Sequence, residues 1–286
     1  MRFSSGGCSG FLFLILSLVP LEILANGCCD DEDIREMWSG DVLRICDNPQ
    51  EHLAVGQLAS FEYFRLGDLV RVEIRSLNPL LVRFAGFAGS ETTKKMTEAA
   101  REHELERLNV TSENTSIRHK GRRADGLWFD HGNSLTVGLF QKIKRVFNFN
   151  PSAAESFLLL KYDQHGHYAP HYDYLNETPE PNYWMSKHGN RLATMLLIAE
   201  TADAGGGTVF PHLGVTVQPE PGDLVLWFNS DAHNEREENS LHGACPIMAG
   251  TKVALSLWIH SYPHRDLKSP LESEDPSYRL DQILKT

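Results

Sequence analysis

Apolar residues recur at helical spacing in two stretches of the first half of the chain. The first covers residues 90–108, where Ser90 is placed to cap a helix with one apolar face. The second follows Asn133. The apolar positions of the two helices are Met96, Ala99 and Ala100, then Leu135, Leu139, Ile143 and Val146. Between the helices, residues 109–123 are polar and predict a loop.

Beyond Pro151 the pattern changes to short apolar runs that are typical of strands. Gly, Pro, Asn and Asp separate these runs, which are rich in Leu, Val and aromatic residues. The runs cover residues 157–162, 191–199, 215–217, 223–228 and 252–259. An earlier run, residues 69–74, alternates apolar and charged residues as a half-buried strand does. We therefore expect an α+β fold with a jelly-roll core, that is a double-stranded β-helix, supported by N-terminal helices.

The two ends of the chain differ from this central part. Arg2 precedes an apolar run, residues 11–21, which is too short to cross a bilayer and predicts a signal peptide cleaved after Ala25. An uncleaved anchor is the alternative, and no other segment is apolar and long enough to span a membrane. The expected division is a signal peptide (1–25), an acidic N-terminal segment (26–75), one main domain (76–262) and a polar surface tail (263–286).

Charge and composition narrow the class of protein. The 286 residues are 41% apolar and 23% charged, an ordinary globular mixture, and the net charge is −11. A basic face is needed to bind phosphates, so nucleic acid is not an expected partner.

Two features agree with entry into the secretory pathway. Glycosylation triplets begin at Asn109, Asn114 and Asn176. The cysteines that remain after cleavage are Cys28, Cys29, Cys46 and Cys245, which allow three pairings. Because adjacent cysteines rarely pair, a bridge from Cys46 to one of the first two is expected, with Cys245 as a buried free thiol.

Candidate chemistry lies in three residues that suit a metal ion. His171 and Asp173 are two residues apart, which places both on one face of a strand, and His242 follows several strands later. Two imidazoles and one carboxylate form the facial triad of non-haem iron(II) oxygenases. Among 13 histidines such a spacing also arises by chance. Lys252 adds weight, because a lysine that opens a buried strand needs a charged partner, and a 2-oxoglutarate carboxylate would supply one.

Three segments that contain these residues closely resemble the prolyl 4-hydroxylases. They read YDQHGHYAPHYD at residues 162–173, GGGTVFP at 205–211, and LHGACP from 241 with GTK and WIH after it. The resemblance runs in order from about residue 78 to 260. It implies an iron(II)- and 2-oxoglutarate-dependent dioxygenase with ascorbate as a further cofactor.

The resemblance also implies roles for individual residues. Tyr162 and Thr194 would help Lys252 to hold 2-oxoglutarate. Three further residues would line the pocket for a peptidyl proline, namely Tyr168, Arg191 and His260. Trp128 matches a packing tryptophan behind a loop that covers substrate.

The chain also departs from the family's pattern in two places. The family's Arg-Thr-Ser run is replaced by Arg-Arg-Ala at residues 122–124, which puts substrate contacts there in doubt. Cys245 matches a cysteine that in collagen-modifying relatives pairs near the C-terminus, where this chain has no cysteine.

These implications lead to one expected function and two alternatives. The expected enzyme hydroxylates peptidyl proline to 4-hydroxyproline in the endoplasmic reticulum lumen, on collagen-like sequences, with protein disulfide isomerase as a partner implied by the resemblance alone. The first alternative keeps the chemistry but changes the substrate to another secreted protein. The second is a non-catalytic secreted jelly-roll protein that binds a partner. A related possibility is a cupin-like protein that only binds a metal ion.

Overall fold

The fold is described from a computed structural model, which covers residues 31–47, 58–112, 115–176, 183–267 and 278–285. The predicted signal peptide, Cys28 and Cys29, and residues 268–277 and 286 of the expected tail lie outside these residues. None of the helices in these ranges is long and apolar enough to cross a membrane.

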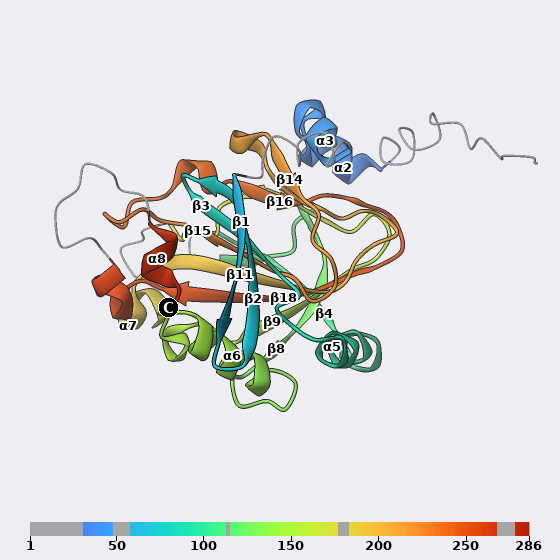
Figure 1. Cartoon of the computed structure of the whole chain (residues 1–286). Helices are drawn as coiled ribbons and strands as arrows, with labels where there is room; N and C mark the ends of the chain where they lie inside the picture. Colours follow the sequence, from blue (N-terminus) through green and yellow to red (C-terminus); the bar gives the residue numbers. More distant parts are fainter. Residues whose placement is uncertain (1–30, 48–57, 113–114, 177–182, 268–277, 286) are drawn as a thin grey trace, which may run out of the picture.

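Two antiparallel sheets face each other across the site (Figure 1). The major sheet has the order β1-β2-β3-β15-β11-β18-β9-β8-β4 and the minor sheet the order β14-β13-β16-β10-β7. The major strands are β1 (Ala59–Arg65), β2 (Asp68–Leu77), β3 (Leu80–Ala85), β15 (Leu224–Phe228), β11 (Arg191–Glu200), β18 (Lys252–His260), β9 (Phe157–Tyr162), β8 (Asp125–Phe129) and β4 (Glu106–Arg107). The minor strands are β14 (Val215–Val217), β13 (Thr208–Phe210), β16 (His242–Ala244), β10 (His167–His171) and β7 (Arg122–Arg123). This arrangement confirms the expected α+β fold with a double-stranded β-helix core.

Helices cover the outer face of the major sheet. The helix α5 (Ser90–Glu102) contributes Met96, and α6 (Val137–Val146) contributes Ile143, to a core that also contains Leu197 of β11. The neighbouring residues of β11, such as Leu196, point instead into the core between the sheets. Strands such as β9, β11 and β18 are therefore buried on both faces, which is why their sequences are mostly apolar rather than alternating.

The five strand runs expected beyond residue 151 and the half-buried strand at residues 69–74 are confirmed, and the two helices are confirmed with shifted ends. Ser90 is the first helical residue rather than the cap, which is Gly89, and the helix ends at Glu102. Beyond it, Glu106–Arg107 pairs with β8 instead of continuing the helix. The expected loop at residues 109–123 contains the hairpin of β5 (Val110–Ser112) and β6 (Thr115–Ile117).

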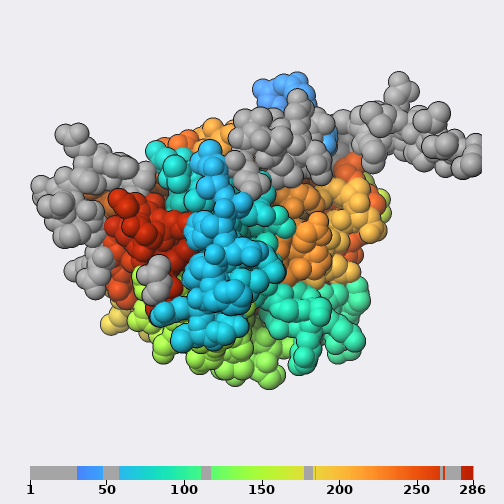
Figure 2. Space-filling model, viewed as in Figure 1, coloured from blue at the N-terminus to red at the C-terminus, as the bar shows by residue number. Residues whose placement is uncertain are grey.

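The expected boundary between residues 75 and 76 falls inside β2, so the structure places no separation there. β2 pairs with β1 on one side and with β3 on the other, within the major sheet. The expected surface tail is also wrong for residues 278–284, because Tyr278, Ile283 and Leu284 are buried in the core. In Figure 2 this red C-terminal segment is part of the same face as the cyan hairpin of β1 and β2.

The remaining elements are short. A two-stranded sheet joins β12 (Ala204–Gly205) to β17 (Ile247–Ala249). The other helices are α2 (Glu32–Met37), α3 (Gly40–Asp47), α7 (Tyr183–His188) and α8 (Leu280–Ile283). The first two of these lie over the minor sheet in Figure 1.

One disulfide joins Cys46 of α3 to Cys245. The expected bridge from Cys46 to Cys28 or Cys29, and the free thiol at Cys245, are therefore both wrong. The two bonded residues are 199 positions apart in the sequence. They meet only because α3 packs on the minor sheet, and nothing in the local sequence around either cysteine indicates that contact.

Candidate active site

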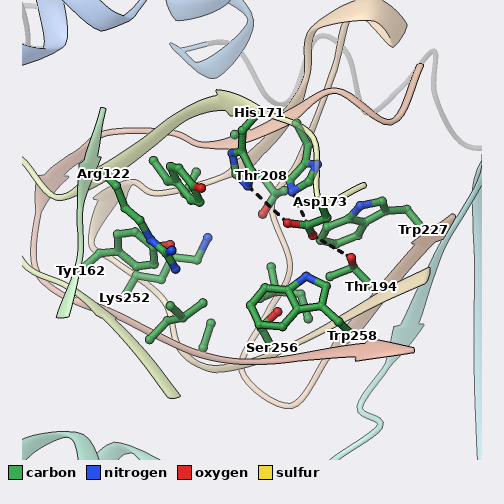
Figure 3. A pocket seen from close by; sticks show the side chains of 17 residues that line it. Arg122, Tyr162, His171, Asp173, Thr194, Thr208, Trp227, Lys252, Ser256 and Trp258 are labelled. Atoms are coloured by element: carbon green, nitrogen blue, oxygen red, sulfur yellow. Dashed lines mark hydrogen bonds and ion pairs between the residues drawn. The ribbon is translucent and has the colours of Figure 1, made fainter. Parts of the chain in front are cut away.

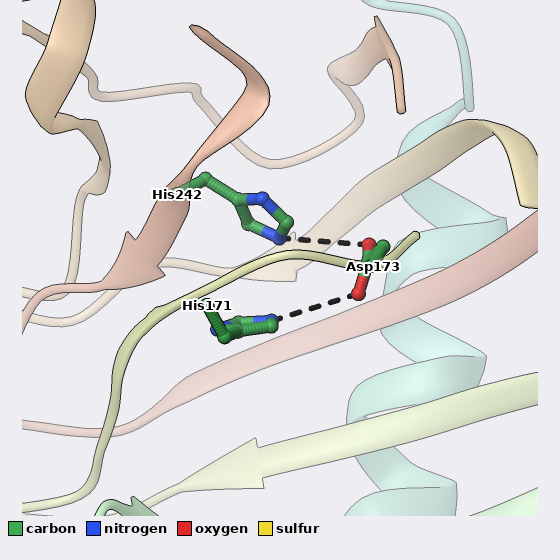
Figure 4. A group of neighbouring side chains, drawn as sticks. All are labelled: His171, Asp173 and His242. Carbon is green, nitrogen blue, oxygen red and sulfur yellow. Dashed lines mark ion pairs between the residues drawn. The ribbon is translucent and has the colours of Figure 1, made fainter. Parts of the chain in front are cut away.

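The three expected metal ligands come together at one point. The ligand atoms of His171, Asp173 and His242 all lie within 4.8 Å of one another. The Nε2 atom of His171 is 3.6 Å from Asp173 Oδ1, and that of His242 is 3.5 Å from Asp173 Oδ2 (Figure 4). His171 is the last residue of β10 and His242 the first of β16, so Asp173 stands just beyond a strand rather than on it.

Backbone carbonyls fix the orientation of both imidazoles. Nδ1 of His171 lies 2.9 Å from the carbonyl oxygen of Ala169, and Nδ1 of His242 lies 2.8 Å from that of Ser240. An Nδ1–H that donates to a carbonyl leaves the lone pair on Nε2, the atom that faces Asp173. The donor set and its tautomers therefore fit a divalent metal ion with open coordination positions, such as iron(II).

Burial and mutual contact set the charges of these groups. Burial lowers the pKa of His242 to about 4, so this imidazole is neutral and able to ligate at pH 7. Burial opposes ionisation of Asp173, but the adjacent His242 and His171 outweigh it and lower the pKa of the carboxyl. Asp173 is therefore a carboxylate at neutral pH.

Two buried residues support Asp173 from behind. The hydroxyl of Thr194 donates to Asp173 Oδ2 at 2.7 Å, and the side-chain amide of Asn229 donates to the Thr194 hydroxyl at 2.8 Å. Thr194 was expected near 2-oxoglutarate. Thr194 also lines the cavity, so that role stays a prediction, but the observed bond of its hydroxyl orients a metal ligand. Asn229 was missed, and its sequence surroundings carry no signal for this contact.

Thr194→Val is expected to weaken metal binding by about 10- to 100-fold, because the carboxylate of Asp173 loses the donor that orients it. Thr208→Val is the matched control: Thr208 is also buried at the cavity, but its hydroxyl has no hydrogen-bond partner among the described residues. Titration of the metal-free protein with Mn²⁺ measures both. Equal affinities in the two variants would show that the bond to Asp173 does not matter.

A cavity that is open to solvent lies between the two sheets beside the metal ligands. Figure 3 shows side chains of both sheets converging on it. Its walls include Arg122, Tyr162, Tyr168, Thr194, Trp227, Lys252, Ser256 and Trp258, together with the three metal ligands.

Lys252 is a buried cation in this cavity. Its ammonium donates to the carbonyl oxygen of Gly206 at 2.7 Å, and it has no carboxylate partner within the described part of the chain. Burial lowers its pKa to about 8. Gly206 has φ +73°, and a Cβ there would lie 2.7 Å from Ile247, so only glycine brings this carbonyl to the ammonium. Tyr162 is the cross-strand neighbour of Lys252, and it also lines the cavity.

The residues expected around a peptidyl proline divide into two groups. Tyr168 lines the cavity, where its ring stacks on that of His171 with centroids 3.5 Å apart. Arg191 lies behind the wall, with its guanidinium 4.0 Å over the ring of Trp258. His260 is fully buried and does not line the cavity, so the expected direct substrate contact is not what this structure places there.

Glu155 connects Arg191 and His260. Arg191 donates to both carboxylate oxygens of Glu155, at 2.6 and 3.0 Å, and His260 Nε2 lies 3.1 Å from one of them. Burial opposes the charge on Glu155, yet Arg191 and His260 outweigh it and hold its pKa at about 2. His260 is thus connected, through Glu155 and Arg191, to Trp258 in the cavity wall. Glu155 was missed, because a single glutamate before a strand has many ordinary explanations.

Glu155→Gln is expected to lower the free energy of unfolding by about 3 kcal/mol at pH 7, because Arg191 loses its buried counter-ion. The pKa of Glu155 falls from 4.5 unfolded to about 2 folded. Its contribution is therefore complete above pH 4.5 and is lost as the pH falls toward 2. Urea unfolding between pH 2.5 and 7 should show the wild type and the variant converging at low pH. A constant difference would contradict the assigned ionisation.

Arg122 also lines the cavity, although the replaced Arg-Thr-Ser run had put contacts there in doubt. Its guanidinium lies 4.5 Å over the ring of Tyr168 and donates to the carbonyl of Asn109 at 2.9 Å. Trp128 is about half exposed and packs against Trp258, with ring centroids 5.9 Å apart.

A sequence model described as the 2OG-Fe(II) oxygenase superfamily matches residues 157–260, the part of the chain that contains the three metal ligands and Lys252. The matched segment is thus similar to this superfamily, and the site that it contains fits the iron(II) and 2-oxoglutarate of the superfamily's name.

Among curated proteins, prolyl 4-hydroxylase subunit alpha-3 of Rattus norvegicus is 30% identical over 235 residues, which are 80% of this chain and 43% of that protein. Prolyl 4-hydroxylase subunit alpha-2 of Caenorhabditis elegans is 29% identical over 194 residues, 67% of this chain and 36% of that protein. The chain thus spans less than half the length of these relatives. Among solved structures, the viral collagen prolyl hydroxylase of Paramecium Bursaria Chlorella virus-1 aligns with a TM-score of 0.49 at 21% identity, over 63% of this chain and 94% of that one.

Proposed function

We propose that this protein is an iron(II)- and 2-oxoglutarate-dependent dioxygenase that hydroxylates peptidyl proline to 4-hydroxyproline. The observation that carries the proposal is the combination, in one cavity, of a His-Asp-His metal set with a buried lysine that has no carboxylate partner among the described residues. A metal-binding protein without a co-substrate would have no use for that lysine. The relatives named prolyl 4-hydroxylase support proline as the target.

Each group has a distinct part in this proposal. Bound iron(II) and 2-oxoglutarate would supply the oxidising power to place oxygen on an unactivated carbon. His171, Asp173 and His242 would hold the metal. Lys252 would pair with a carboxylate of the co-substrate, and Tyr162 would lie beside it. The chain's contribution is to position these groups and to exclude side reactions.

We propose that the proline ring of the substrate binds against the aromatic part of the cavity. Tyr168 and Trp258 offer aromatic walls, and Arg191 is fixed over Trp258 by Glu155. Apolar walls with a few fixed polar groups are usual for sites that bind a small ligand in one orientation. We propose collagen-like sequences as substrate, and another secreted proline-containing protein as the second candidate.

The test is a 2-oxoglutarate decarboxylation assay with purified protein, Fe²⁺, ascorbate and peptide. A (Pro-Pro-Gly) repeat is compared with non-collagen proline peptides, and mass spectrometry locates the added oxygen on the product. Peptide-dependent succinate with 4-hydroxyproline supports the proposal, and the preferred peptide identifies the substrate class. No succinate under any condition would favour a non-catalytic binding protein.

The cellular setting is part of the same proposal. We propose that residues 1–25 are a signal peptide and that the protein resides in the endoplasmic reticulum lumen. We also propose glycosylation at Asn109, Asn114 or Asn176, use of ascorbate, and pairing with protein disulfide isomerase. The bond between Cys46 and Cys245 supports an oxidising compartment, since structural disulfides are rare in the cytosol. Expression of the full chain in a secretory cell, with glycosidase digestion and co-purification, tests these points.

A further inference from the structure

The helices α2 and α3 form a cap on the outer face of the minor sheet (Figure 1). We call the two helices and Trp38, which follows α2, the α2–α3 cap. Residues of the cap pack with residues of β10, β13 and the segment after β16 in one buried cluster. Its buried members are Ile34, Trp38, Cys46, Ala169, Val209 and Cys245.

The cap lies directly behind the wall that carries the metal ligands. Side chains alternate between the two faces of a strand. Thr208 and Ala244 line the cavity, while their chain neighbours Val209 and Cys245 belong to the cluster with the cap. The minor sheet is therefore one layer thick between the cap and the cavity.

Trp38 touches the strand at the residue after a ligand. A Cβ added to Gly243 would lie 3.1 Å from Cη2 of the Trp38 indole and 2.9 Å from the carbonyl oxygen of Tyr168. Glycine at this position lets the indole and β10 both approach the backbone of β16. His242 is the preceding residue, so the indole contacts the backbone that fixes the position of the His242 side chain.

The disulfide fixes the same strand covalently. Cys245 is three residues beyond His242, and its partner Cys46 lies in α3. The other strand is held as well, because Ala169 belongs to the cluster and its carbonyl faces Nδ1 of His171. The α2–α3 cap thus covers the backbone segments that carry both histidine ligands.

We propose that the α2–α3 cap, locked by the Cys46–Cys245 disulfide and seated through Trp38, positions His171 and His242 for metal binding. The inference rests on the proposed metal site. Trp38, Cys46 and Cys245 are positioning residues, since none of them touches the metal. Without the lock, β16 and β10 gain freedom, and ordering the two imidazoles then costs part of the metal's binding free energy. Loss of such outer support lowers metal affinity by about 10- to 100-fold.

The first test compares Cys46→Ala/Cys245→Ala and Trp38→Leu with the wild type. Glu36→Gln is the matched control, because Glu36 lies on the exposed side of α2 and pairs with Lys120 rather than packing on the sheet. Each metal-free protein is titrated with Mn²⁺ by calorimetry, and circular dichroism checks that it is folded. We expect a 10- to 100-fold loss of affinity in the first two variants and wild-type affinity in the control. Wild-type affinity in all of the folded variants would overturn the inference.

The second test needs no substitution. A water-soluble phosphine reduces the wild-type disulfide to two thiols and is itself oxidised to the phosphine oxide with an oxygen atom from water. After the reagent is removed under argon, Mn²⁺ affinity should fall to that of the double cysteine variant, and the same treatment should leave that variant unchanged. Unchanged affinity in the reduced wild type would overturn the role of the disulfide. A wild type that binds no metal before reduction would overturn the proposed function, and the inference with it.

Discussion

Asp173→Ala is expected to reduce 2-oxoglutarate turnover below detection, by at least about 1,000-fold. The carboxylate is the only anionic group among the three ligands, and it lies between the two imidazoles at 3.5 and 3.6 Å. An ion left with two neutral nitrogen ligands loses both a bond and its charge partner. His171→Ala should have the same effect.

The measurement is succinate formation together with Mn²⁺ titration of the metal-free protein. Asp163→Asn is the matched control, because Asp163 is exposed, pairs with Lys161, and does not line the cavity. It should retain wild-type turnover and metal affinity. Turnover retained in Asp173→Ala would remove the metal assignment, whereas loss in both variants would indicate a general effect on folding.

The parts of the site that sequence can predict are those that one short segment specifies. The strand residues 157–162 and 252–259 are mostly apolar, with Lys161, Lys252 and Ser256 as exceptions, because both faces of each strand are buried. Such runs can be recognised from the local sequence alone. His171 and Asp173 are two residues apart in the sequence. Lys252 is the first residue of a buried strand, where a lysine needs a charged partner. These features were enough for the fold class and for the metal set.

What the sequence could not predict depends on contacts between distant segments. Asn229 supports Asp173 only through Thr194 on the adjacent strand. Cys46 meets Cys245 only because α3 packs on the minor sheet. The polar composition of residues 263–286 predicted a surface tail, although Ile283 is fully buried in the core. In each case the partner is more than 30 residues away, and no periodicity along the chain encodes it.

Lys252→Met is expected to have two opposite effects. The metal-free protein becomes more stable at pH 7, by about 3 kcal/mol, because a buried ammonium without a carboxylate partner is replaced by an apolar side chain of similar length. The affinity for 2-oxoglutarate falls, because a charge pair worth about 2–5 kcal/mol is lost, which is roughly 30-fold to several thousand-fold.

The pH dependence of the stability gain identifies its cause. The pKa of Lys252 is about 8 in the folded protein against 10.5 in the unfolded chain, so between these values the unfolded chain binds more protons. The stability of the wild type relative to the variant therefore rises as the pH goes from 8 to 10.5, and the gain of about 3 kcal/mol disappears. Urea unfolding of both proteins from pH 7 to 10.5 measures this convergence.

Lys161→Met is the control for both effects, because Lys161 lies on the paired strand β9 but pairs with Asp163 and does not line the cavity. It should keep the affinity for 2-oxoglutarate and show no gain in stability. Lys252→Met with unchanged affinity would mean that the co-substrate carboxylate binds elsewhere, even if the stability gain appears. A gain in stability joined to a loss of affinity would instead show that Lys252 is kept at a cost to the fold, for the sake of the anion it binds.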